Sequence, residues 1–349
     1  MNITYCINHT PIEIQIDVRR HQCFLIRKSN LMLNIEKKVQ NCYEKSPFPN
    51  ILQNSADFER DICEGIEWTI LNWEALGFDW KVIRPSTVLC AGCGTGEEAI
   101  ILSRLLPNAV IHAIDISESS LVIAKQNAVR ALAKNIIFER LSILEDLPLV
   151  SNKYDLVYCS GVIHHLRAPE IGFETLLHSV SEKGDIIFSL YNTYGLLIYL
   201  CRLRVLDILA GNDPFRRIKW TMRMGFHDGK NQATLWDSFV HPQVTTYSIS
   251  QVRKWATTHS RIIMGISPPL SISGLIAYAL KGQRFVQRRQ WLIKTLLRFF
   301  RQFVNEPTGI HGKNHPRLSN SSSPVRDMFF QIIYFFLGKG ECFYYISNN

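Results

Sequence analysis

The chain has 349 residues, of which 46% are hydrophobic and 20% are charged, so it is long enough for one large globular domain or two ordinary ones. This composition excludes disorder along the whole chain, and it excludes collagen-like, coiled-coil and low-complexity proteins. The formal net charge of +9 comes from one segment, because residues 269–340 contain eleven basic and two acidic side chains, a difference of nine. The rest of the chain is formally neutral, which argues against a protein that binds nucleic acid over its whole surface.

The cysteines and the N-terminal sequence both indicate a cytoplasmic location. The nine cysteines are odd in number and scattered, a pattern typical of free thiols. Only Cys90 and Cys93 form a C-x-x-C pair, and no second pair completes a zinc site, so we expect no bound metal. Residues 1–20 contain Glu13 and Asp17 and lack the apolar core of a secretory signal.

Between Thr87 and Tyr191 the sequence alternates short β-branched runs with helical patterns, as in a parallel sheet built from βαβ units. We predict strands, apolar on both faces because helices cover both sides of such a sheet, at Thr87–Ala91, Ala109–Asp115, Ile136–Glu139, Tyr154–Ser160 and Asp185–Tyr191. Helices are expected at Phe58–Leu76, Glu97–Leu106, Ser119–Leu132 and Pro169–Glu182. The fold class is therefore α/β.

Beyond Tyr191 the regular alternation stops. We expect a lid or substrate insertion at 193–246, then a helix at Ser248–Thr257, a strand at Arg261–Ile266 and a last strand at Cys342–Ile346. The uncharged stretch Ile262–Leu280 contains Pro268 and Pro269, so it predicts a strand and a turn rather than a membrane span. The expected organisation is an N-terminal extension with a covering helix (1–85), a core (86–192, 247–268 and 341–349), and two insertions (193–246 and 269–340).

A glycine-rich loop follows the first predicted strand. The sequence from Gly92 to Gly96 reads G-C-G-T-G, and Asp115 ends the next strand 23 residues after Gly92, where a ribose-binding acid is expected. Glu97 stands where a dinucleotide fingerprint needs its third glycine, and adjacent acids would repel a pyrophosphate at this helix N-terminus. A ligand with one carboxylate and a nearby cationic centre fits better, and S-adenosylmethionine has both.

These motifs resemble class I S-adenosylmethionine-dependent methyltransferases. The resemblance lies in the run Val88–Gly96, in Ala113–Ser117, and in Tyr154–Val157 leading into Ser160–His165. It implies a Rossmann-like, doubly wound, mostly parallel seven-stranded sheet with an antiparallel last strand. More narrowly, the segments Tyr43–Asn50 (with its PFPN sequence), Leu190–Gly195 and Trp236–Pro242, together with the GVIHH loop, are similar to a bacterial subgroup.

The resemblance also implies which residues bind the cofactor. Gly92, Gly94 and Gly96 match the family's glycine loop and would pack against the methionine part of the cofactor. Asp115 matches the acid that holds both ribose hydroxyls, and Ile116 the apolar residue beside the adenine. Ala91, Cys93, Ile143 and Ser160 are further expected cofactor-binding residues. Ser142 stands where an acid usually meets the adenine amino group, so the adenine contact is left open between Ser142, Glu145 and Asp146.

Candidate catalytic residues follow the later strands. Methyl transfer depends mainly on aligning the acceptor and excluding water, with a base to take a proton from an oxygen or amine acceptor. His165 follows the fourth strand and Tyr191 ends the fifth, at the sheet edge where ligands bind. Asp237 and His241 lie four residues apart in the first insertion. They either act together as a general base beside the acceptor or form hydrogen bonds with backbone groups of the loop.

The basic segment contains a predicted amphipathic helix at Arg284–Val304, with aromatic and aliphatic residues on one side and basic residues on the other. Such a helix packs on the domain, lies on an anionic membrane or binds an anionic ligand. The sequence thus predicts a methyltransferase for a small-molecule acceptor, such as a sugar, a lipid-linked compound or a secondary metabolite. The alternatives are an RNA methyltransferase, for which no RNA-binding module is visible, and an inactive cofactor-binding partner subunit.

Overall fold

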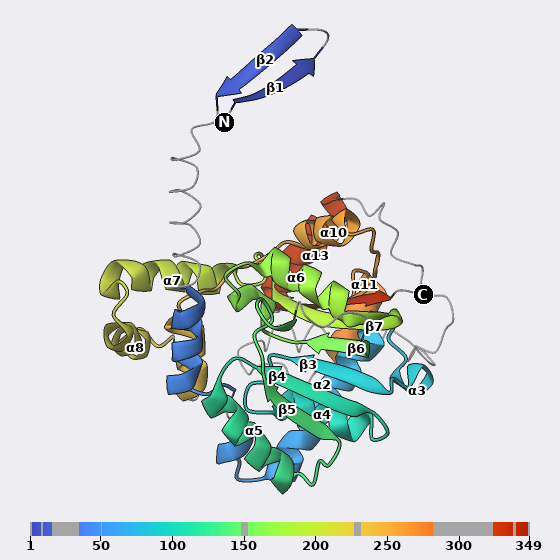
Figure 1. The fold of residues 1–349 in the computed structure, drawn as a ribbon. Coiled ribbons are helices and arrows are strands. Elements are labelled where there is room, and N and C mark those ends of the chain that lie inside the picture. The colour runs from blue at the N-terminus through green and yellow to red at the C-terminus, as the bar shows by residue number, and fades with distance from the viewer. Residues whose placement is uncertain are drawn as a thin grey trace.

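The computed structural model describes residues 2–7, 10–15, 35–49, 51–147, 153–226, 232–281, 324–337 and 340–347. Its centre is a seven-stranded sheet in the order β5-β4-β3-β6-β7-β9-β8 (Figure 1). The strands are β3 (Thr87–Ala91), β4 (Val110–Asp115), β5 (Ile136–Arg140), β6 (Tyr154–Cys159), β7 (Val180–Tyr191), β8 (Ile263–Ser267) and β9 (Glu341–Ser347). Strand β9 pairs antiparallel with both β7 and β8, whereas the pairs from β5 to β7 are parallel. The expected doubly wound sheet with an antiparallel last strand is confirmed.

Helices cover both faces of this sheet (Figure 1). On one face, α2 (Phe58–Leu76) and α4 (Glu97–Leu105) pack on alternate strand residues such as Val88 and Cys90, near α5 (Glu118–Arg130). On the other face, α6 (Pro169–Ser179), α10 (Ile249–Thr258) and α13 (Pro324–Leu337) pack on Leu89 and Ala91. Successive strand side chains point to opposite faces, so one short apolar strand serves both layers.

Local sequence signals explain several element boundaries. Helix α2 has the predicted bounds, because the Asp57 side chain accepts the Arg60 N–H at its start and Gly77 ends it at a φ of 74°. Helix α10 begins with a capping box between Ser248 and Gln251. Pro169 occupies the first turn of α6, where no backbone donor is needed.

Two expectations about the central sheet need correction. The helix predicted to reach Glu182 ends at Ser179, because Val180 already pairs with Tyr154 and β7 therefore begins five residues before Asp185. Strand β5 is not apolar and buried on both faces, because it lies at the edge of the sheet and leaves Ile137 57% exposed.

In its described residues, 193–226 and 232–246, the first insertion contains the helices α7 (Leu197–Ala210), α8 (Pro214–Arg223) and α9 (Gln232–Phe239). They surround a small apolar cluster of their own, formed by Leu206, Leu235 and Phe239, and α7 and α8 project from the side of the sheet (Figure 1). This unit places Trp236–Pro242 beside the carboxyl ends of the strands.

The stretch after β8 forms a turn and then a further helix, α11 (Ile272–Lys281), where the sequence predicted only a turn. The Tyr278 hydroxyl of α11 donates to Asn72 of α2 at 3.1 Å, and Tyr334 of α13 is fully buried, so both helices are integral to the core.

The predicted helix Arg284–Val304 lies outside the described residues. Within the part of the chain that is described, none of the helices has the length and apolar character needed to cross a membrane. The remaining elements are the short helices η1 (Leu52–Asn54), α3 (Trp80–Ile83) and η3 (Ile163–His165), and an N-terminal hairpin of β1 (Asn2–Ile7) and β2 (Thr10–Gln15).

Candidate functional site

A pocket of about 430 Å³ lies at the carboxyl ends of the parallel strands. This is the edge of an open α/β sheet where ligands bind, and the volume is in the range of small-molecule sites. Of the residues expected to bind the cofactor, the pocket wall includes Gly92, Cys93, Gly94, Asp115, Ile116, Ser142, Ile143 and Ser160. Ala91 and Gly96 are not part of the wall: Ala91 is buried in the sheet core, and Gly96 caps α4.

The glycines after β3 are required by contacts within the protein. Gly92, Gly94 and Gly96 all have positive φ, which favours glycine. A Cβ on Gly92 would lie 2.4 Å from Cγ2 of Val162, and one on Gly94 would lie 2.3 Å from the carbonyl oxygen of Phe48. Gly92 and Gly94 therefore belong to the pocket wall, and Val162 and Phe48 occupy the space that a side chain at these positions would need.

Asp115 closes β4 with its carboxylate in the pocket wall. Oδ2 accepts the Gly94 N–H at 2.8 Å and Oδ1 accepts the Ser117 N–H at 2.9 Å, so the side chain is fixed in one orientation. Burial raises the pKa of this carboxyl, although these backbone bonds oppose the shift. A carboxylate held this way retains lone pairs for two ligand hydroxyls.

A segment that the sequence analysis left without a role closes the other side of the pocket. We call residues 35–49 the lid segment; its first part, 35–45, is helical. The Glu44 carboxylate accepts the N–H groups of Glu118 and Ser119 at the start of α5, at 2.8 and 3.0 Å. The Phe48 carbonyl accepts the Thr95 N–H at 3.1 Å. The lid segment is thus bound to the loops that follow β3 and β4.

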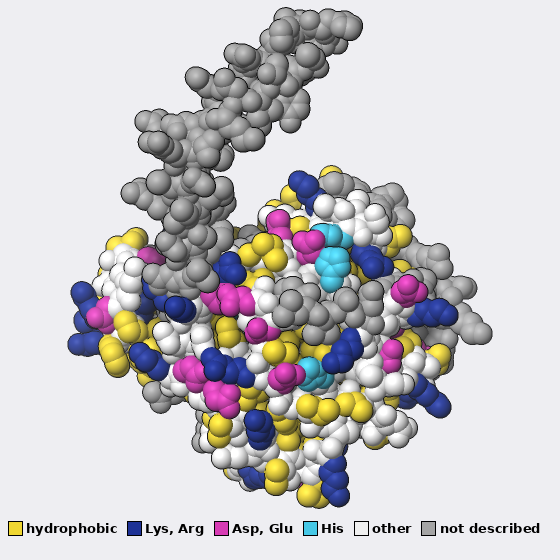
Figure 2. All heavy atoms as spheres, viewed as in Figure 1, with side chains coloured by type: hydrophobic (Ala, Val, Ile, Leu, Met, Phe, Trp, Pro, Cys, Tyr) yellow, Lys and Arg dark blue, Asp and Glu magenta, His cyan; other side chains and the backbone are white. Residues whose placement is uncertain are grey.

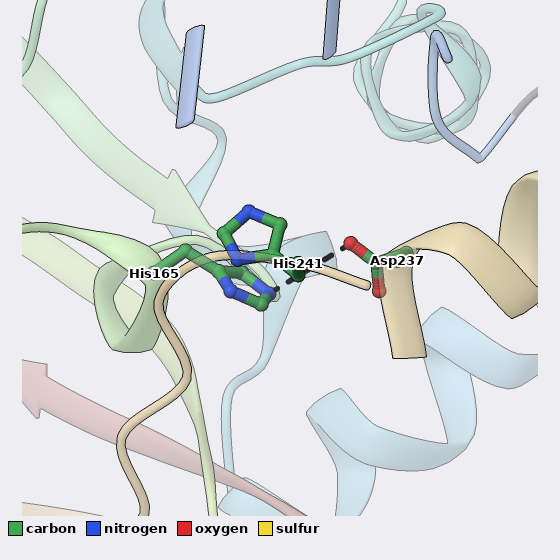
Figure 3. Close-up of side chains that lie close together, drawn as sticks. All are labelled: His165, Asp237 and His241. Atoms are coloured by element: carbon green, nitrogen blue, oxygen red, sulfur yellow. Dashed lines mark ion pairs between the residues drawn. The ribbon is translucent and has the colours of Figure 1, made fainter. Parts of the chain in front are cut away.

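The four predicted catalytic residues lie near one another beside this segment. His165, Tyr191 and Asp237 line the pocket, and the ring of His241 lies against His165 with a centroid distance of 4.0 Å. Figure 3 shows Asp237, from α9, facing the two imidazole rings, with Nε2 of His165 at 4.0 Å from Oδ1 of Asp237. The Tyr43 hydroxyl of the lid segment donates to the same Oδ1 at 3.0 Å.

Hydrogen bonds to Gln243 define the two tautomers. Nδ1 of His165 lies 2.8 Å from the Gln243 carbonyl oxygen and therefore carries the hydrogen, which leaves Nε2 as the basic nitrogen. Nδ1 of His241 accepts the Gln243 N–H at 3.1 Å, and burial lowers the pKa of this imidazole well below its usual range. His241 is accordingly a neutral ring that carries its hydrogen on Nε2, and His165 is the one suited to take a proton.

His165, Asp237 and His241 also form a cluster of metal-ligand type, with one ligand atom of each within 4.8 Å of the others. A tetrahedral zinc site has ligand atoms about 3.3 Å apart, given Zn–N distances near 2.0 Å. The cluster would have to contract, and Nδ1 of His241 would have to give up its backbone donor, before it bound an ion. The hydrogen-bond pattern favours a proton-transfer site.

His164 differs from its neighbour in the same loop. Its ring is fully buried and stacks on Tyr191 with a centroid distance of 3.7 Å. Neither ring nitrogen has a hydrogen-bond partner among the described residues, and burial lowers its pKa well below the usual value. His164 therefore supports the position of Tyr191, and His165 faces the pocket.

Two glutamates that the sequence pattern does not mark also belong to the pocket wall. Glu98 and Glu341 both line the pocket, and burial, followed by the charge of Glu341, raises the pKa of Glu98 to about 7. Oε2 of Glu98 is buried without a hydrogen-bond partner among the described residues. The Ser189 hydroxyl of β7 donates to Glu341, which opens β9. Such a pair favours a cationic donor in the pocket, and the ammonium group of S-adenosylmethionine is one.

Residues 85–215 match the family model of a methyltransferase domain. This range contains β3 and its glycine loop, Asp115 and the His165 loop, which form much of the pocket wall. Residues 85–215 are therefore similar to S-adenosylmethionine-dependent methyltransferase domains, and for this range the cofactor and the enzyme class expected from the sequence are confirmed. The residues of this methyltransferase domain fit the cofactor, because Asp115 offers a carboxylate for a diol and Glu98 an unpartnered oxygen for an ammonium group.

Three known proteins place the domain in context. An uncharacterized protein of Synechococcus sp. is 27% identical over 232 residues, which are 55% of this chain and 54% of that protein. A tRNA U34 carboxymethyltransferase of Helicobacter pylori is 22% identical over 65% of this chain and 87% of its own length. The structure of PKMT2 from Rickettsia typhi in complex with AdoHcy shares the fold, with a TM-score of 0.50, 13% identity, and coverage of 81% of this chain and 52% of that one. The chain spans only 54%, 37% and 25% of the first three curated relatives that it matches.

Proposed function

We propose that this chain transfers the methyl group of S-adenosylmethionine to a small, neutral or cationic acceptor, and that His165 takes the acceptor's proton. The observation that carries the proposal is the His165–Asp237 pair. It lies in the same pocket wall as the glycine loop and Asp115, with Nε2 of His165 as the basic nitrogen. Asp237 would stabilise the imidazolium that forms. Tyr43 and Tyr191 would orient the acceptor from either side.

Methyl transfer takes place as a single displacement at the methyl carbon. S-adenosylmethionine supplies, when bound, a methyl group on a positively charged sulfur. The acceptor's lone pair forms the new bond to that methyl carbon, and the electron pair of the S–CH3 bond returns to sulfur. Nε2 of His165 receives the hydrogen that the acceptor nitrogen or oxygen gives up. The buried rings around His165 exclude water from this step.

The charge of the pocket supports the acceptor class. The wall contains seven acidic residues and one basic residue, Arg167. Three of the acids are bound to a cation or to backbone donors: Glu36 pairs with Arg167, Glu97 accepts the N–H groups of Ile51 and Leu52, and Asp115 accepts two backbone N–H groups. Of the other four, Asp237 accepts the Tyr43 hydroxyl hydrogen, Glu341 accepts that of Ser189, and Asp61 lies 3.6 Å from Arg60. Glu98 has one oxygen, Oε2, without a hydrogen-bond partner among the described residues. An acceptor with a phosphate or carboxylate near the reacting atom would meet repulsion there, whereas an amine or a hydroxyl would not.

RNA methylation is the second candidate, and the Helicobacter pylori relative and the basic segment 269–340 favour it. On the visible face in Figure 2, however, basic and acidic side chains are interspersed rather than gathered into a basic stripe. The acidic pocket wall is also unsuited to a polyanion. We therefore rank a small acceptor above RNA.

An inactive cofactor-binding subunit is the third candidate, which the sequence suggested through Ser142. The Ser142 hydroxyl donates to the Glu36 carboxylate at 2.9 Å, so an acid is present at this position after all.

The contact of Phe48, in the segment Tyr43–Asn50, with the glycine loop supports membership of the subgroup that shares this segment. Free thiols among the described cysteines support a cytoplasmic location, and a membrane role for 284–304 stays a prediction.

The test uses the purified chain and S-adenosylmethionine labelled in its methyl group. The chain and the labelled cofactor are incubated with separate pools of small amines, small hydroxyl compounds, carboxylates, phosphorylated compounds and bulk RNA. We expect label in the amine or hydroxyl pool, and loss of at least about 100-fold in rate for His165→Ala with unchanged AdoHcy affinity. Label confined to RNA or to the carboxylate pool would contradict the proposed acceptor. Binding of AdoHcy without labelling of any pool or of a cell extract would favour the inactive subunit.

A further inference from the structure

Glu36 is an acidic residue of the lid segment that reaches into the pocket. Its side chain is only 13% exposed, and it belongs to the pocket wall. Oε1 accepts the Ser142 hydroxyl hydrogen at 2.9 Å, and Oε2 accepts the Arg167 Nε–H at 2.5 Å. These partners come from the loops after β5 and after β6, so two different loops fix the carboxylate.

The position of Glu36 in the pocket follows from the helix that carries it. Gln40, one turn further on, donates from its side-chain amide to the Ile116 carbonyl at 3.5 Å. The helix therefore passes over Ile116 on its way to Ser142. The glycine loop contacts Asp115, which accepts its Gly94 N–H, and both belong to the same pocket wall as Ile116, Ser142 and Glu36. A nucleoside held at its ribose by Asp115, with its amino-acid end at the glycine loop, must extend its base along Ile116 and Ile143 toward Glu36.

The chemistry of the two groups is complementary. The exocyclic amine of adenine is a hydrogen-bond donor, and an ionised carboxylate is an acceptor with about four lone-pair positions, of which two are used here. We propose that Glu36 accepts a hydrogen bond from this amine, so that the lid segment itself recognises the base of the cofactor. The proposal rests on the cofactor of the methyltransferase domain and adds a residue from outside the matched range 85–215.

The two acids considered from the sequence are less suited to this contact. The Asp146 carboxylate accepts the backbone N–H of Ser142 at 2.7 Å, and neither Asp146 nor Glu145 belongs to the pocket wall. Glu145 is 51% exposed and lies 3.7 Å from Arg167. Ser142 thus acts through Glu36, to which it donates, and the acid comes from a helix 106 residues earlier in the chain.

The experiment measures binding by calorimetry with AdoHcy and with its 6-deamino analogue, in which hydrogen replaces the amino group. We expect the wild-type chain to bind AdoHcy at least about tenfold more tightly than the analogue, because a hydrogen bond to a charged group is lost. In Glu36→Ala this preference falls to within about threefold. Both compounds lack the transferable methyl group, so the measurement needs no acceptor.

Glu44→Ala is the matched control, because it removes a glutamate from the same helix that contacts the start of α5 rather than the pocket. It is expected to weaken both ligands by the same factor and to keep the wild-type preference. An unchanged preference in Glu36→Ala, or the absence of a preference in the wild-type chain, would overturn the proposal. If AdoHcy itself does not bind, the proposed function fails and the preference is irrelevant, so the two failures are distinct.

Discussion

The Tyr43 hydroxyl donates a 3.0 Å hydrogen bond to Oδ1 of Asp237, a residue 194 positions later in the sequence. Burial, followed by the charge of Asp237, raises the pKa of Tyr43 well above its ordinary value, so the hydroxyl keeps its hydrogen at all physiological pH values. The bond joins the lid segment to the first insertion, and both residues line the pocket. It also fixes the carboxylate that faces His165.

Replacing Tyr43 with Phe removes this bond and keeps the ring. Because Asp237 is buried, we expect the free energy of unfolding in urea to fall by about 1–3 kcal/mol. Tyr194→Phe, at a tyrosine that is 36% exposed, is the control and should change it by less than about 0.5 kcal/mol. Equal effects of the two changes would show that the bond contributes no stability.

Replacing Asp115 with Asn removes the charged acceptor for the ribose while keeping its shape. The affinity for AdoHcy, measured by calorimetry, should fall by about 100-fold or more, because two hydrogen bonds to a charged group are weakened. Asp79→Asn is the control, because Asp79 caps α3 through the Lys81 N–H and is not part of the pocket wall. Unchanged affinity in Asp115→Asn, or retention of a nicotinamide nucleotide instead of AdoHcy, would contradict the cofactor site.

The raised pKa of Glu98 predicts a pH dependence of stability. The folded chain holds a proton on Glu98 up to about pH 7, whereas the unfolded chain releases it near 4.5. The folded state therefore binds more protons between these values, and the free energy of unfolding decreases as the pH rises through this window. The shift corresponds to roughly 3 kcal/mol at most, at 1.36 kcal/mol per pKa unit.

Urea unfolding of the cofactor-free protein at pH 5 and pH 8 checks this dependence. Glu98→Gln should lose less stability between the two pH values than the wild-type chain does. Glu64→Gln, at a residue of α2 that is 56% exposed, should leave the difference unchanged. A wild-type pH difference that survives in Glu98→Gln would assign it to other groups.

A methyl group on Gly94 tests how the lid segment is seated. Its Cβ would lie 2.3 Å from the Phe48 carbonyl oxygen, so Gly94→Ala should displace the lid segment, weaken AdoHcy by at least about tenfold and destabilise the fold by more than about 2 kcal/mol. Gly225→Ala is the matched control, because Gly225 also has positive φ but has open space around its Cβ position. It should cost only about 1–2 kcal/mol and leave binding unchanged. Similar behaviour of the two variants would mean that Phe48 moves aside freely.

The parts of this structure that were predictable are those with local signals. The bounds of β3 and α2 follow from an apolar run and from the caps at Asp57 and Gly77, and the glycine loop and Asp115 follow from their spacing. Helix α7 was not predicted because it is apolar on several sides and its periodicity is weak. Helix α8 does carry local signals, since it is amphipathic and Asp213 caps its start before Pro214, and these signals were missed. The predicted helix at Arg284–Val304 lies outside the described residues.

The candidate site was predictable only on the side built from consecutive βα loops. His165 and Tyr191 could be selected because they follow strand ends, and Asp237 because it lies four residues before His241, although the structure places it in α9 rather than in a loop. The contacts of Glu36 with Ser142 and of Ser189 with Glu341 join residues 106 and 152 positions apart, and no local pattern marks such a pair. The one available signal was the segment Tyr43–Asn50, which was noticed as a resemblance and given no chemical role.

Strand β9 has a consequence for the order of events during synthesis of this protein. It pairs with β7 on one side and β8 on the other, and it brings Glu341 to the pocket. Until residues 341–347 have left the ribosome, β7 and β8 lack the strand that lies between them, and the pocket wall lacks Glu341. Unpaired strand edges promote association between chains, so the sheet of a nascent chain stays exposed to such association until β9 has been added.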